Sequence, residues 1–169
     1  MAFRGAVKHC CYPRPSVART CYQGIDKGDL NVSIYDVLTG QAPFRDAVRQ
    51  TEDDGFDILP ANGDLTAAEI ELLGLEHRES ILRNVLAGVA ADYDFIVIDC
   101  PPSLNMLTLN SLVAAHGVVI PMQCEYYALE GLSQLLNTVH LVQRSINDTL
   151  GIDGVLLTMY DARLNLSRQ

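Results

Sequence analysis

The sequence lacks the features of membrane-embedded, secreted and metal-centred proteins. No apolar run approaches the roughly 20 residues that a membrane-spanning helix needs. No apolar stretch follows Arg4 and Lys8 that could serve as a signal peptide. The five cysteines form no C-x-x-C pair, and the four histidines are scattered without metal-ligand spacing. These absences favour a cytoplasmic protein with free thiols and no membrane partner.

The composition is that of one globular domain. The chain has 169 residues, of which 49% are hydrophobic and 20% are charged, so it can bury one proper core but not two. Cys100 and Cys124 each end an apolar run, and we expect both to be small buried residues. The sequence shows no internal repeat and no low-complexity tract.

The charge distribution divides the chain into two regions. Residues 1–24 hold four basic residues and no acidic one, whereas residues 25–169 hold the other 8 basic and all 21 acidic residues. The first region also has no sustained hydrophobic period, so we predict an atypical, disordered head at 1–24; a nucleic-acid-binding arm is the alternative. The acidic body is a poor nucleic-acid surface by itself. It forms the second region, 25–169.

Helical and strand patterns alternate through this second region. The predicted helices run from a cap at Asn31 or Ser33 to Leu38, and over Phe44–Gln50, Thr66–Leu73, Ile81–Val89, Ser103–Ala115 and Leu129–Val142. The predicted strands are Asp57–Pro60, Phe95–Ile98, Gly117–Pro121 and Gly154–Thr158. This order predicts an α/β fold with a mostly parallel sheet and right-handed crossovers.

One carboxylate stands where such folds bind ligands. Asp99 follows the apolar run Phe95–Ile98 directly, and the carboxyl ends of the strands in an open α/β sheet face the ligand crevice. A carboxylate there can hold Mg²⁺ beside nucleotide phosphates, in the manner of a Walker B aspartate. An aspartate that merely caps the next helix is the alternative. Pro101 and Pro102 then fix two successive φ angles, which predicts a rigid turn.

Longer stretches carry a family resemblance. DYDFIVIDCPPSLNMLTLNSLVAA, VVIPMQCEYYALEGLSQLLNTV and GVLLTMYDARLNLS resemble ParA/Soj-type chromosome- and plasmid-partitioning ATPases, in the order that this family uses. GIDKGDLNVSIYDVLTG and DILPANGDLTAAEIELL resemble the family's upstream region. The resemblance covers Gly24 to Gln169. It implies a three-layer, P-loop NTPase-like fold that lacks the family's first strands and its C-terminal part.

The resemblance also implies ligands, partners and site residues. Intact members bind ATP and Mg²⁺, dimerise, bind DNA non-specifically and respond to a ParB-type partner at the nucleoid. Asp99 falls on the magnesium-binding Walker B aspartate, and Pro101, Pro102 and Ser103 fall on the switch segment. Glu125, Tyr126 and Tyr127 fall on a loop near the dimer-facing edge. The residues expected near the adenine are Met159, Tyr160 and Asp161.

The family's phosphate-binding loop, which resembles KGGVGKTT, has no counterpart in the sequence. Lys8 and Lys27 are the two lysines, and no Gly-Lys-Ser/Thr occurs. Backbone N–H groups and a lysine of such a loop hold the phosphates, so we predict no measurable ATP binding and no catalytic residues. A frameshift or misplaced start would explain the unusual head; a genuine alternative N-terminus is the other possibility.

Two further interpretations stay open from the sequence. The chain could be a non-catalytic interaction module, or a receiver- or flavodoxin-like domain, although a receiver needs an acidic pair after its first strand. A MinD-type relative would carry a C-terminal membrane helix. Without the family's first strands, Phe95–Ile98 and Val118–Ile120 would be unpaired edges prone to aggregation, unless these two strands draw together.

Overall fold

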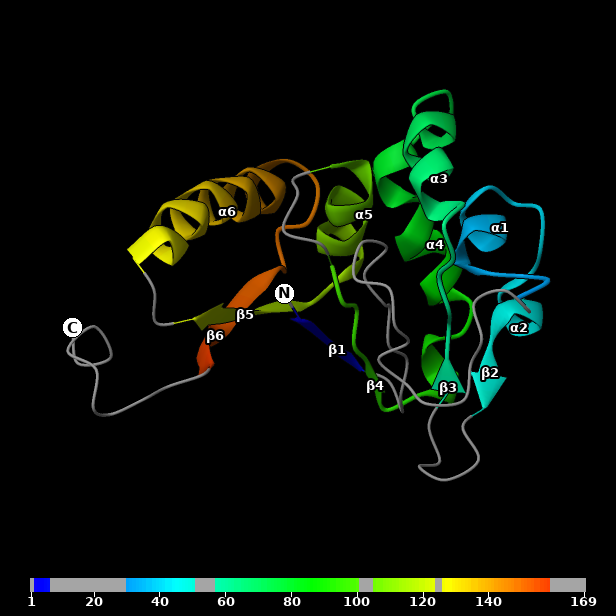
Figure 1. Cartoon of the computed structure of the whole chain (residues 1–169), viewed down its shortest axis with the longest axis horizontal. Coiled ribbons are helices and arrows are strands. Elements are labelled where there is room, and N and C mark those ends of the chain that lie inside the picture. Colours follow the sequence, from blue (N-terminus) through cyan, green and yellow to red (C-terminus); the bar gives the residue numbers. More distant parts are fainter. Residues whose placement is uncertain (1, 7–29, 51–56, 101–104, 124–125, 159–169) are drawn as a thin grey trace.

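The computed structural model describes residues 2–6, 30–50, 57–100, 105–123 and 126–158 (Figure 1). From Asp57 onward the helices and strands follow one another in the order that the sequence predicts. No helix among these residues combines the length and the apolar character needed to cross a bilayer.

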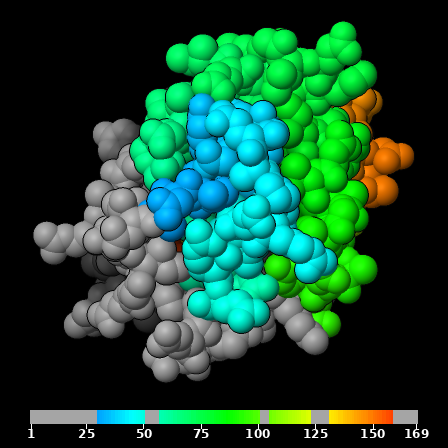
Figure 2. Space-filling model, turned by 90° about the vertical axis from the view of Figure 1, so that its right-hand side faces the viewer, coloured from blue at the N-terminus to red at the C-terminus, as the bar shows by residue number. Residues whose placement is uncertain are grey.

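The first described helices form the end of the molecule that is farthest from the sheet's edge strand β6. Helix α1 (Ile34–Leu38) begins at Ser33, whose hydroxyl accepts from the Tyr35 N–H while Asp36 accepts from the Ser33 N–H at 2.7 Å. This reciprocal capping selects Ser33 over Asn31 as the cap. Helix α1 packs against α2 (Phe44–Ala47), α3 (Leu65–Leu72) and α4 (Ile81–Ala87). Figure 2 shows the blue and cyan residues of this end beside green ones.

The second predicted helix is shorter than expected. It ends at Ala47, and Arg49–Gln50 instead form strand β2, which pairs antiparallel with β3 (Asp57–Ile58). Val48, whose φ of −70° and ψ of 140° are extended, marks the change. A two-residue strand made of polar residues has no recognisable pattern, so only its pairing partner defines it.

The main sheet has four strands in the order β4-β1-β5-β6. Strand β5 (Gly117–Gln123) runs parallel to β6 (Gly151–Thr158), from Gly117 opposite Gly151 to Gln123 opposite Thr158. Both strands are longer than predicted. The parallel pair and its connecting helix α6 (Tyr126–Ser145) confirm the predicted α/β class.

Strand β1 comes from the head. Ala2–Ala6 lie between β4 (Phe95–Ile96) and β5, antiparallel to both, so β4 and β5 run parallel to each other. The two strands therefore do not draw together, because a third strand separates them. Residues 7–24 lie outside the described residues, so only for them does disorder remain a prediction.

The core lies between the sheet and the helices. Helices α5 (Met106–Ala114) and α6 run along one face of the sheet (Figure 1). Between them and the sheet, Leu112, Val118 and Val139 are fully buried. On β6, by contrast, Val155 and Leu157 are 46% and 47% exposed. A second helical layer over β5 and β6 is not among the elements that the structure describes.

Helix α5 begins later than predicted. Its cap is Asn105, whose side-chain oxygen accepts from the Thr108 N–H at 3.0 Å, rather than Ser103. Asparagine caps a helix as well as serine does. Ser103 itself lies outside the described residues.

Candidate functional site

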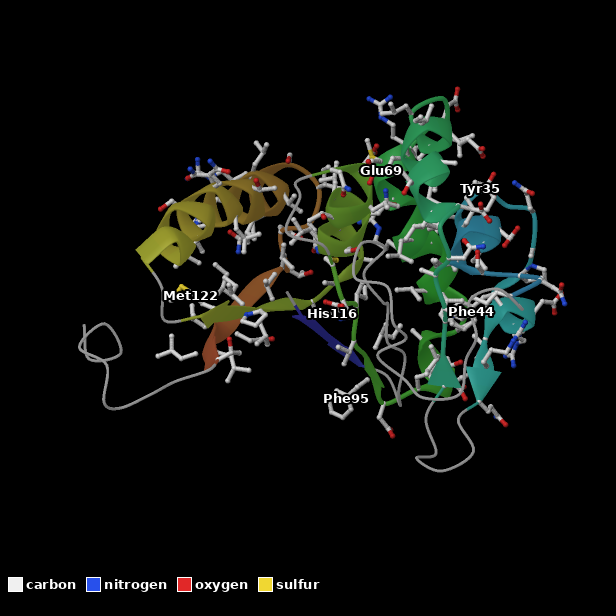
Figure 3. All side chains as sticks on the ribbon, in the orientation of Figure 1. Tyr35, Phe44, Glu69, Phe95, His116 and Met122 are labelled. Carbon is white, nitrogen blue, oxygen red and sulfur yellow. The ribbon has the colours of Figure 1, made fainter. Side chains whose placement is uncertain are left out.

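Asp99 lies three residues beyond the end of β4, on the outer face of the sheet. The side chains alternate along this segment: Ile96, Ile98 and Cys100 are 9%, 5% and 1% exposed, whereas Phe95 and Val97 are 53% and 39% exposed. Since successive residues of an extended strand point to opposite faces, Asp99 shares a face with Phe95 and Val97. Phe95 points away from the helices (Figure 3). The half-buried Asp99 carboxylate therefore lies on the face opposite the core.

The sequence indicates a buried parallel strand over Phe95–Ile98, but β4 ends at Ile96, and Phe95 and Val97 are exposed. The run is apolar throughout, but only Ile96 and Ile98 pack into the core. Apolar residues on both faces predict a strand covered on both sides, and the described residues cover one side here.

The carboxyl ends of β4, β5 and β6 point in the same direction, but β4 does not end level with β5 and β6. Gly5 pairs with Ile96 and Ala2 with Val119, and continuing this register along β1 places Asp99 level with Val119. Gln123 and Thr158 end the neighbouring strands opposite each other. The residues predicted to bind nucleotide follow Asp99 and Thr158 closely in the sequence. One segment therefore starts level with Val119, and the other starts level with Gln123, four residues farther along β5.

Most of the predicted site residues cannot be placed. Pro101, Pro102, Met159, Tyr160 and Asp161 all lie outside the described residues. The same is true of Glu125, and of the side chains of Tyr126 and Tyr127, which begin α6. Their assignment to switch, dimer-facing and adenine-facing positions remains a prediction.

Cys100 follows Asp99 but is not available as a metal ligand. Its side chain packs in the core, and burial raises the pKa of the thiol to about 12, although a hydrogen bond with Ser111 acts in the opposite direction. A thiol with such a pKa stays protonated at neutral pH, whereas metal ions bind the thiolate. The prediction that Cys100 is a buried structural residue is confirmed; Cys124 lies outside the described residues.

The residues present fit the magnesium side of a nucleotide site and not its phosphate side. The described residues contain no cluster of three or more histidine, cysteine, aspartate or glutamate side chains able to hold a metal ion. Mg²⁺ beside a nucleotide needs only one or two carboxylates, since water and phosphate complete its shell, and Asp99 can supply one. No Gly-Lys-Ser/Thr loop exists in the sequence to hold the phosphates.

Two features escaped the sequence analysis. One is a groove of about 510 Å³ between α3, α5 and α6, where Asn105 donates to the Glu69 carboxylate and Ile70 and Leu141 are 74% and 66% exposed. Ile70 and Leu73 lie three residues apart and outside the buried face of α3, and this spacing could have indicated the groove. The other is a buried asparagine, Asn147, which holds the end of α5. No sequence pattern marks a single polar side chain of this kind.

Comparisons with known proteins agree on one family. Residues 15–152 match the family described as AAA domain. Over 146 residues the chain is 53% identical to the sporulation initiation inhibitor protein Soj of Bacillus subtilis and 49% identical to the chromosome partitioning protein ParA of Myxococcus xanthus. Each alignment covers 86% of this chain, and 58% and 52% of those proteins respectively. The chain thus spans little more than half the length of these relatives.

Solved structures share the fold. A Mycobacterium smegmatis protein described as cobyrinic acid a,c-diamide synthase, with bound ADP and magnesium, superimposes with a TM-score of 0.89 at 42% identity. The match covers 96% of this chain and 66% of that one. A plasmid partition protein from Borrelia burgdorferi superimposes with a TM-score of 0.74 at 23% identity, over 96% of this chain and 69% of that one. The second likeness shows the fold alone.

Proposed function

The chain belongs to the AAA domain family, among the ParA/Soj-type partitioning ATPases, and from this membership we propose that it carries the magnesium side of a DNA-segregating ATPase. Asp99 binds Mg²⁺ through a water molecule, and the segments after Asp99 and Thr158 border the nucleotide. The observation that supports this most strongly is the place of Asp99 three residues after β4, a strand that runs parallel to β5.

The proposed activity is incomplete in this chain. ATP hydrolysis needs phosphate-binding and magnesium-binding groups together, because both stabilise the charge that develops during phosphoryl transfer. With Asp99 and no phosphate loop, the chain does not hydrolyse ATP by itself. ATP-dependent homodimerisation, non-specific DNA binding, a ParB-type partner and a cytoplasmic, nucleoid-associated location belong to the proposal for the complete site.

The relatives favour partitioning over amide synthesis. The M. smegmatis structure is described as a synthase, but Soj and ParA proteins share 48–53% identity with this chain. The ADP and magnesium in the M. smegmatis structure support nucleotide binding on this fold in either case.

Titration calorimetry with ATP and Mg²⁺ tests the proposal in two steps. The chain itself should give no measurable ATP binding, and micromolar affinity would overturn the claim that its site is incomplete. In the second step, the N-terminal part of B. subtilis Soj, including its phosphate loop, replaces residues 1–23. This fusion should bind ATP, and Mg²⁺ should tighten the binding.

Two variants of the fusion locate the metal. Asp99→Asn should remove the effect of Mg²⁺ and leave metal-free ATP binding unchanged. Asp148→Asn is the matched control, because this exposed carboxylate lies before β6, at the opposite edge of the sheet, and it should change neither. If Mg²⁺ tightens ATP binding equally in the folded fusion and in its Asp99→Asn variant, the assignment of Asp99 as the metal-binding residue is refuted.

A further inference from the structure

A short connection joins the candidate magnesium residue to helix α5. Asp99 precedes this connection, and Asn105 ends it as the cap of α5. The connection, residues 100–104, includes Pro101 and Pro102, which the family resemblance assigns to the switch segment. The course of such a segment depends on how firmly its two ends are held.

The first end is held by Cys100. Its side chain is fully packed in the core and hydrogen-bonds with Ser111 of α5. Ser111 in turn donates to the Leu107 carbonyl at 2.9 Å, within the same helix. The chain that leaves Asp99 is thus anchored to the middle of α5.

The second end is held by a hydrogen bond from another helix. The Asn105 side-chain oxygen accepts from the Thr108 N–H at 3.0 Å, and its amide nitrogen donates to the Glu69 carboxylate of α3. Figure 3 shows Glu69 between α3 and α5. One amide group therefore caps α5 with its acceptor and joins α3 with its donor. We call the bond between Glu69 and Asn105 the α3–α5 clasp.

Glu69 is well placed to orient the cap. Leu65, Ala68 and Leu72 anchor α3 with side chains that are fully buried, and a group on a rigid element fixes its partner more precisely than one on a loop. The acceptor is a half-buried carboxylate, and a hydrogen bond to an ionised acceptor is stronger than one between neutral groups. The clasp therefore keeps the capping oxygen of Asn105 directed at α5.

We propose that Glu69 is a positioning residue for the magnesium side of the nucleotide site. Through Asn105, it fixes the point at which the segment after Asp99 enters α5. This inference rests on the proposed function, in which that segment borders the nucleotide. Without the clasp the Asn105 amide rotates freely, so the segment has more conformations to lose when nucleotide and Mg²⁺ bind.

Glu71 offers a matched control on the same helix. Its carboxylate accepts from the Tyr35 hydroxyl at 2.9 Å and so joins α3 to α1. Glu69→Ala and Glu71→Ala each remove one carboxylate link between two helices, and alanine favours the helix in both cases. A general role in helix packing predicts that the two variants act alike, whereas positioning predicts that only Glu69→Ala affects the start of α5.

The first experiment follows amide exchange at Thr108 by NMR in the full chain, without nucleotide. Glu69→Ala should speed this exchange about fivefold, because the capping oxygen loses its support. Glu69→Gln keeps an oxygen acceptor and should restore the wild-type rate. Glu71→Ala should leave the rate unchanged. Equal exchange in wild type and Glu69→Ala, or equal acceleration by both alanine variants, would overturn the proposal.

The second experiment measures how far Mg²⁺ tightens ATP binding in the Soj fusion, by titration calorimetry. Glu69→Ala should reduce this tightening about fivefold, whereas Glu69→Gln and Glu71→Ala should preserve it. Equal tightening in the parent fusion and in Glu69→Ala would refute the positioning role and leave the proposed function intact. A parent fusion on which Mg²⁺ has no effect would refute the proposed function, and this inference with it.

Discussion

Replacing Asn147 with alanine should cost more stability than any exposed polar substitution in the chain. Asn147 lies between α6 and β6 and is 8% exposed. Its amide nitrogen donates to the carbonyl oxygens of Leu112, Val113 and Ala115 at 3.1, 3.2 and 2.8 Å. The last carbonyls of a helix have no partner within it, so this one side chain satisfies the end of α5 just before β5 starts.

The size of the effect follows from the three backbone carbonyl groups that lose their hydrogen-bond donor. A buried acceptor without a partner costs about 1–3 kcal/mol, and we expect a total loss of about 3 kcal/mol because local rearrangement lets water reach part of the site. For a domain of this size that corresponds to a decrease in Tm of about 6–12 °C. Thr149→Val removes only the hydroxyl that donates to the Asn147 Oδ1 at 2.9 Å, and should cost about 1 kcal/mol.

Urea unfolding followed by circular dichroism measures the change in the free energy of unfolding. An unchanged slope m shows that wild type and variant expose the same amount of surface on unfolding. The matched control is Asn84→Ala, since Asn84 is exposed on α4 and alanine is the better helix former; it should change stability by less than about 0.5 kcal/mol. A loss below about 1 kcal/mol for Asn147→Ala would refute the reasoning, because it would mean that the three carbonyls find other partners readily.

Two further predictions concern charge. Because the Cys100 pKa is raised from 9.0 to about 12 in the folded chain, its contribution to stability is complete below pH 9 and is lost as pH rises toward 12. The stability difference between wild type and Cys100→Ala should therefore fall by about 1 kcal/mol from pH 9 to pH 10 in urea melts; pH profiles that stay parallel would contradict this. Arg45 and Asp92 form an ion pair at 2.7 Å with side chains 76% and 50% exposed, so Arg45→Ala should cost less than about 1 kcal/mol. A larger loss in the same melts would show that the pair is shielded from solvent.

The sequence predicted those parts of the fold that local patterns determine. The Ser33 cap, the helix from Ile81 and the strands around Val118 and Val155 depend on neighbouring residues, and the structure confirms them. Strand β1 could not be predicted, because AFRGA has no strand pattern and forms one only against β4 and β5. Tertiary pairing overrides propensity here.

The sequence indicated the neighbourhood of Asp99 but not its orientation. An aspartate after an apolar run predicted a carboxylate at a strand end; β4 ends at Ile96, and Asp99 follows three residues later. The face of the sheet on which Asp99 lies could not be predicted, because Phe95–Ile98 are apolar at every position. Without alternation of apolar and polar residues, the sequence does not distinguish the two faces of a strand. The exposures of Phe95 and Val97 supplied the answer.

The place of β1 in the sheet has a consequence for biosynthesis. Gly5 leaves the ribosome roughly 90 residues before its partner Ile96, and Ala2 leaves still earlier relative to Val119. Contacts so distant in sequence form late, because loop closure is costly until the intervening chain has folded. The first strand to be synthesised therefore waits longest for its partners. Until then the nascent chain exposes β4 and β5 to any chaperone or partner strand that reaches them first.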